Sequence, residues 1–109
     1  MDESLQREPE INKFFHWARI HEASDLYLHV GSPLQLRLRG VVRCLDMRPI
    51  TQEDMDRLVS PILYDEQRHC LSEGKEVTFV YAIEEDDAYR VEVSSKDGGL
   101  SLSARRLKR

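Results

Sequence analysis

The sequence predicts an α+β domain, in which a mostly antiparallel sheet of about six strands carries helices on one face. Two groups of three short segments alternate apolar and polar residues with a period of two, one group before residue 46 and one after residue 76. Stripes with a helical period occupy residues 9–22 and 51–72. Short turns join the strands of each group, and only antiparallel neighbours can be joined so closely. The predicted order is α-β-β-β-α-α-β-β-β.

The composition is that of a single soluble globular domain, with 109 residues, 40% hydrophobic and 33% charged. A net charge of -4 argues against non-specific nucleic-acid binding, which needs cationic side chains to neutralise phosphates. Cys44 and Cys70 match neither a disulfide framework nor a zinc site, so reduced thiols in a cytoplasmic protein are expected. The sequence contains no apolar run long enough to span a membrane, so any membrane association is expected through partners.

The first helix is predicted over residues 9–22, after a flexible N-terminus at 1–8. Pro9 suits a first helical turn. The apolar stripe follows the i, i+3, i+4, i+7 rule and consists of Ile11, Phe14, Phe15 and Ala18. Trp17 and Ile20 widen this apolar face, and they either cap the core or face a partner.

The first three strands follow this helix directly. Leu26, Leu28 and Val30 alternate with polar residues, and Gly31-Ser32-Pro33 forms a turn. Residues 34–39 alternate in the same way. Gly40 permits a tight reversal into the third strand, Val41–Leu45.

Two helices connect the two groups of strands. Thr51 with Asp54 resembles a capping box, and an apolar stripe then runs from Met55 to Ile62. Pro61 should end or kink this helix. Asp65 is expected to cap a second helix that runs to about Ser72, and Gly74 to stop it.

The last three strands have apolar residues on one face and polar residues on the other. The residues expected to share the inner face are Val77, Phe79, Tyr81 and Ile83, then Tyr89, Val91 and Val93, then Leu100, Leu102 and Ala104. The acidic residues 84–87 are interpreted as a solvated hairpin tip. Asp97-Gly98 is a strong signal for the second hairpin turn.

The outward-facing arginines of that second hairpin form the candidate site. If Asp97-Gly98 is a two-residue turn, Arg90 lies directly opposite Arg105 on the polar face. Like charges in this position are destabilising unless an anion or an acid lies near them, and a phosphate would suit the guanidinium fork. If Gly98-Gly99 forms the turn instead, Glu92 faces Arg105. Glu92 could also reduce the repulsion diagonally in either register.

Several motifs of this chain together resemble a known family. They are Ala23-Ser24-Asp25-Leu26, Pro33…Arg37…Gly40…Arg43, Pro49-Ile50-Thr51, Glu66-Gln67-Arg68, Glu76-Val77-Thr78-Phe79 and Tyr89-Arg90-Val91. In order and spacing the chain is similar to the N-terminal domain of type IV pilus retraction (twitching motility) ATPases. Type II secretion ATPases, of the general secretion pathway protein E superfamily, share a looser version. The resemblance covers roughly residues 10–107.

The resemblance implies a PAS-like N-terminal domain at 9–107 and, from 108–109, a linker to a RecA-like ATPase domain outside this chain. It implies a cytoplasmic homo-hexamer that binds ATP and Mg mainly through that other domain, with no cofactor held by this fragment alone. Arg90 and Arg105 match the family's arginines that reach the nucleotide phosphates. An inner-membrane pilus or secretion platform protein is the implied partner, and no catalytic or metal-ligating residue falls in this chain.

The chain departs from the family pattern at four positions. Tyr27 replaces a usual His, Arg39 a usual Asp and Glu92 an Asn, and Gly98 stands where another arginine is common. These departures indicate a divergent or specialised member. Two other functions remain open at this point, a free-standing PAS-like sensor of a small ligand and an adaptor that docks a protein partner.

Overall fold

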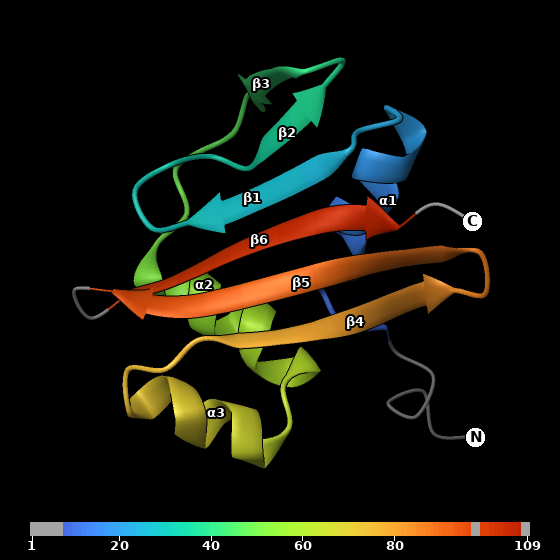
Figure 1. Cartoon of the computed structure of the whole chain (residues 1–109). Helices are drawn as coiled ribbons and strands as arrows, with labels where there is room; N and C mark the ends of the chain where they lie inside the picture. Colours follow the sequence, from blue (N-terminus) through green and yellow to red (C-terminus); the bar gives the residue numbers. More distant parts are fainter. Residues whose placement is uncertain (1–7, 97–98, 108–109) are drawn as a thin grey trace, which may run out of the picture.

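The computed structural model describes residues 8–96 and 99–107. It forms one six-stranded antiparallel sheet with the order β3-β2-β1-β6-β5-β4 (Figure 1). The predicted fold class and element order are confirmed. Nearly all of the expected flexible segment 1–8, the Asp97-Gly98 turn and the expected linker start at 108–109 lie outside the described residues.

The strands form two meanders that meet at the centre of the sheet. β1 and β6 pair there, and they join the N-terminal and C-terminal meanders. The strands are β1 Asp25–His29, β2 Gln35–Leu38, β3 Val41–Cys44, β4 Val77–Glu84, β5 Asp87–Lys96 and β6 Gly99–Leu107.

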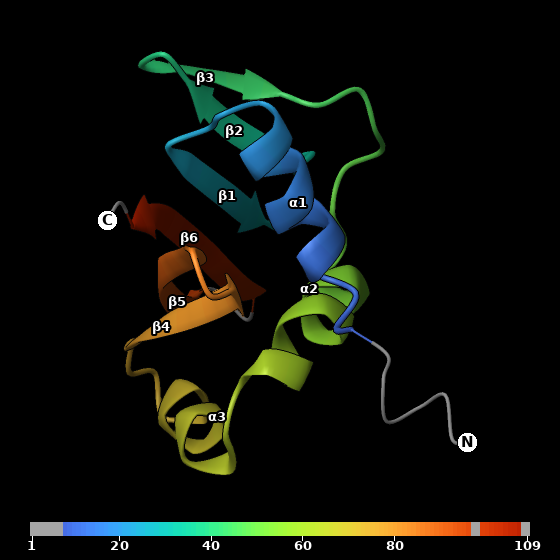
Figure 2. The ribbon, with the colours of Figure 1, turned by 90° about the vertical axis from the view of Figure 1, so that its right-hand side faces the viewer.

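The helices cover one face of the sheet and leave the other face open (Figure 2). They are α1 Asn12–Ile20, α2 Gln52–Val59 and α3 Asp65–Ser72, with a short 3-10 turn, η2, at Ser60–Ile62. No helix within the described residues is long and apolar enough to cross a membrane.

The first helix is shorter than the predicted 9–22. At its start, the Asn12 amide bonds the Pro9 carbonyl in a tighter turn (3.0 Å). At its end, Glu22 takes a left-handed conformation, with φ of 56°. The Ala23 amide then reaches back to the Ala18 carbonyl (2.8 Å), which is a common way to satisfy a helix end.

The starts of the two connecting helices differ from one another. The predicted capping box of α2 is confirmed, because Thr51 Oγ1 accepts from the Asp54 amide (3.1 Å) and Asp54 Oδ2 from the Thr51 amide (2.9 Å). Asp65 is not the cap of α3 as predicted but its first helical residue, and Tyr64 precedes it. Gln67 Oε1, three residues on, accepts from the Tyr64 amide (2.7 Å).

Aromatic rings attach α1 to the sheet. The fully buried ring of Phe15 lies 4.7 Å from that of Tyr89 and 5.5 Å from that of Tyr81. The Tyr81 hydroxyl donates to Asn12 Oδ1 (2.6 Å). On the same helix Ile20 is 72% exposed and Trp17 is 42% exposed, so of the two alternatives for this face, the one in which both residues cap the core is wrong.

The acidic hairpin tip is only partly solvated, contrary to the prediction. Asp87 opens β5 on the same face as Tyr89, where the end of α1 covers it, and its side chain is completely buried. Its carboxylate accepts no hydrogen bond within the described residues. Two arginines partner it at longer range, Arg106 Nε at 3.7 Å and Arg19 Nη1 at 4.0 Å.

Candidate functional site

The register of the last hairpin places the two candidate arginines opposite each other. Arg90 pairs with Arg105 and Val91 with Ala104, which confirms the register expected for an Asp97-Gly98 turn. The alternative register, with Glu92 opposite Arg105, is wrong, because Glu92 pairs with Ser103.

These arginines belong to a row that crosses the open face of the whole sheet. From β3 to β4, the cross-strand partners along this row are Val42, Arg37, Asp25, Arg105, Arg90 and Val80. The row therefore holds three guanidinium groups and a single carboxylate. An excess of positive charge on adjacent strands favours an anionic partner.

Asp25 is the carboxylate within this row, and its side chain is only 8% exposed. Arg105 Nε donates to Asp25 Oδ2 (3.1 Å), and the Ser24 hydroxyl donates to Asp25 Oδ1 (2.7 Å). Arg37 Nε lies 3.7 Å from the same Oδ1. Asp25 thus partly neutralises the arginines on both neighbouring strands.

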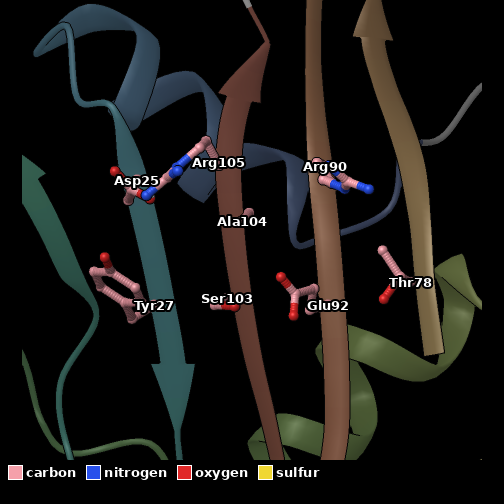
Figure 3. Close-up of a pocket in the computed structure, with 8 residues that line it drawn as sticks. All are labelled: Asp25, Tyr27, Thr78, Arg90, Glu92, Ser103, Ala104 and Arg105. Atoms are coloured by element: carbon pink, nitrogen blue, oxygen red, sulfur yellow. The ribbon is translucent and has the colours of Figure 1, made fainter. Parts of the chain in front are cut away.

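The two candidate arginines point away from each other in the structure (Figure 3). Arg105 turns towards Asp25, whereas Arg90 turns towards β4. Among the described residues, no carboxylate lies within ion-pairing distance of Arg90, and Glu92 pairs with neither arginine. The expected compensation by Glu92 is therefore absent from this part of the chain, and Asp25 takes that role for Arg105.

Arg37 is anchored on its strand by groups other than Asp25. Its Nε donates to the Tyr27 hydroxyl (3.2 Å), and its Nη1 donates to the Gly40 carbonyl (3.3 Å). The hydrogen bond to Tyr27 and the nearby Asp25 raise the pKa of Arg37. Tyr27, where the family usually has His, thus holds one arginine of the row.

Two surface hollows flank the Asp25–Arg105 pair. One has a volume of about 470 Å³, and Tyr27, Arg90, Glu92 and Ser103 are among its lining residues (Figure 3). The other has a volume of about 550 Å³, and its lining includes Arg37 and Arg106. Asp25 and Arg105 line both hollows, so both hollows adjoin this pair.

The chemistry available at this surface is anion binding. Guanidinium groups donate hydrogen bonds but neither accept protons nor act as nucleophiles, so they stabilise charge without covalent steps. In the described part of the chain, no three His, Cys, Asp or Glu side chains come together to hold a metal ion.

Comparisons with known proteins agree with the resemblance expected from the sequence. The chain is 27% identical over 90 residues to the type IV pilus retraction ATPase PilT of Pseudomonas aeruginosa, a match that covers 83% of the chain and 26% of PilT. The predicted resemblance to the secretion and pilus ATPases is confirmed. The chain is also 30% identical over 87 residues to the uncharacterized protein YggR of Escherichia coli, covering 80% of the chain and 26% of YggR. No family model matches.

Solved structures of the PilT kind share the fold. The pilus retraction motor PilT with bound ADP superposes with a TM-score of 0.78 at 24% identity, over 93% of this chain and 29% of that one. The ATPase DotB of Legionella pneumophila gives a TM-score of 0.75 at 18% identity, over 93% of this chain and 30% of DotB. The chain spans about a quarter of the length of its curated relatives, 26% in each case.

Proposed function

We propose that residues 9–107 are the N-terminal, PAS-like domain of a hexameric secretion or type IV pilus ATPase. On this proposal the chain continues from 108–109 as a linker to a RecA-like ATPase domain. Three observations support it: the sequence similarity to PilT, the shared fold, and the small fraction of these relatives that the chain covers.

Arg90 and Arg105 are proposed to contact the phosphates of ATP, which the ATPase domain binds together with Mg. The observation that carries this role is the row on the open face, which holds three arginines and one carboxylate and in which Arg90 has no carboxylate partner among the described residues. Guanidinium groups held on adjacent strands suit a polyphosphate, because each can donate two parallel hydrogen bonds. They would stabilise charge on the transferring phosphoryl group without covalent chemistry.

Alone, the domain is not expected to hydrolyse ATP. Its proposed contributions are subunit assembly and the coupling of hydrolysis to pilus motion or protein transport. The proposed location is the cytoplasm, peripheral to the inner membrane, where a pilus or secretion platform protein would be the partner.

The test is Arg105→Ala in the full-length protein. Removing a donor to a developing charge typically lowers turnover on the order of a hundredfold, so ATPase turnover should fall while the domain stays folded by circular dichroism. Arg43→Ala removes the same charge from an exposed site on β3, outside the row, and serves as the matched control. Normal turnover in Arg105→Ala would rule out the phosphate role.

A further inference from the structure

We propose that Asp25 competes with the bound phosphate for Arg105, so that anion binding requires Arg105 to exchange one partner for the other. The proposal rests on the phosphate role of Arg90 and Arg105. Its starting observation is the divergence of these two side chains, with Arg105 held at Asp25 on the far side from Arg90 (Figure 3).

Arg105 can leave Asp25 by a rotation of its side chain alone. The backbone of Arg105 is fixed, because β6 is paired on both sides, with β1 and with β5. Its side chain is 74% exposed, and the hydrogen bond from Nε to Asp25 is the one hydrogen bond found for it among the described residues. Asp25 is buried but the Arg105 guanidinium is exposed, so water reaches it as it leaves, and a phosphate with two or more negative charges can replace Asp25 as its partner.

Asp25 keeps partners when Arg105 departs. A buried carboxylate that loses its only cation would strongly oppose the exchange. Here the Ser24 hydroxyl still donates to Oδ1 (2.7 Å), and Arg37 Nε lies 3.7 Å from the same oxygen. Arg37 is itself held in place by Tyr27 and Gly40, so it remains beside Asp25 whether or not Arg105 is there.

Asp25 therefore sets the affinity of the row for anions. With Asp25 charged, the row carries three positive charges and one negative charge. When the charge of Asp25 is removed, the repulsion between the anion and the carboxylate disappears and Arg105 is released. The Coulomb energy of one charge on a neighbouring anion in a partly hydrated site amounts to roughly one decade in affinity. Asp25→Asn should thus tighten anion binding about tenfold, because it removes both the repulsion from the carboxylate and the contact that holds Arg105 in the anion-free state.

The experiment titrates inorganic tripolyphosphate into this chain and follows binding by NMR at constant ionic strength. Glu92→Gln is the matched control, because Glu92 lines the same hollow and its neutralisation changes the charge by the same amount without touching Arg105. We expect the dissociation constant to fall about tenfold for Asp25→Asn. For Glu92→Gln it should fall only about two- to threefold, because the Glu92 carboxylate acts on the anion through its charge alone and does not hold Arg105.

A double-mutant cycle separates competition from simple charge. In an Arg105→Gln background, the gain from Asp25→Asn should fall to the level of the Glu92→Gln gain, because Arg105 is no longer there to be released and Arg37 stays held by Tyr27 and Gly40. An undiminished gain in that background, or weaker binding by Asp25→Asn, would overturn the competition. Binding that is unchanged by both Arg90→Gln and Arg105→Gln would instead overturn the phosphate role itself. No binding to this chain would overturn the competition at this row and leave the phosphate role to the turnover of Arg105→Ala in the full-length protein.

A measurement on the unaltered chain keeps the proposal testable if Asp25→Asn does not fold. The Arg105 Nε–H resonance should shift with the same midpoint as tripolyphosphate binding, because this group changes its acceptor. Binding that shifts the resonances of Arg90 but leaves the Arg105 Nε–H resonance in place would contradict the exchange.

Discussion

The turn between β2 and β3 contains a strained residue, and relieving this strain should stabilise the protein. Arg39 and Gly40 join the paired residues Leu38 and Val41 with φ values of 52° and 82°. Positive φ at both positions is the geometry for which Asn-Gly is the favoured pair. Glycine meets it freely, whereas arginine in the left-handed region brings its Cβ close to the following carbonyl oxygen.

The expected gain for Arg39→Asn is about 1 kcal/mol in the free energy of unfolding, the usual cost of a left-handed residue other than Gly, Asn or Asp. The side chain of Arg39 is exposed and makes no hydrogen bond or ion pair within the described residues, so little is lost in exchange. A gain of this size raises the midpoint of thermal unfolding by roughly 4–8 °C in a domain of about 100 residues.

Urea denaturation and calorimetry of three variants check this reasoning. Arg39→Lys keeps both the charge and the backbone cost, so its stability should match that of the parent. Arg43→Gln removes an equivalent charge from the neighbouring exposed strand with a side chain of similar length, and it measures what the charge contributes. If Arg39→Asn is no more stable than Arg39→Lys, or gains no more than Arg43→Gln, the strain argument is refuted.

Three further predictions concern pH and capping. Burial raises the pKa of Tyr89 to about 12, so the unfolded chain should lose this proton first, and stability should fall from pH 10 to 12 by up to about 1.4 kcal/mol per pH unit. Denaturation midpoints of Tyr89→Phe against the parent isolate this group, and parallel pH curves would contradict it. Thr51→Ala should cost about 1 kcal/mol by urea denaturation through loss of the α2 cap. Hydrogen bonds from Arg48, and to a smaller extent from Thr51, lower the pKa of Asp54 below its ordinary 3.8. The unfolded chain therefore takes up this proton first as the pH falls below that value, and Asp54→Asn should lessen the resulting loss of stability.

The parts of the fold that could be predicted are those that depend on neighbours in sequence. The alternation of Arg90 with Val91 assigns the two faces of β5, and the short hairpin sets which residue of β6 each one meets. The ends of the helices are less predictable from the sequence. Glu22 ends α1 in a left-handed conformation that no residue preference of Glu indicates.

The site shows the same division between local and distant determinants. The Arg90–Arg105 pair follows from one hairpin, whereas Asp25 contacts Arg105 across 80 positions of the chain. That contact depends on the pairing of β1 with β6, which no local pattern specifies. The burial of Asp87 was likewise missed, because it requires α1 to pass over the end of β5. The one available signal for its burial is that Asp87 lies two residues before Tyr89, which places it on the inner face of the same strand.

The central position of β6 has a consequence for how the chain folds. β6 is the last strand of the described residues, yet it is the one that joins the two meanders. During synthesis, β1 to β3 would therefore wait with an unpaired edge until residues 99–107 emerge from the ribosome. Contacts between such distant segments slow folding and leave edges open to wrong partners. Deleting or weakening β6 should accordingly unfold both halves of the sheet together.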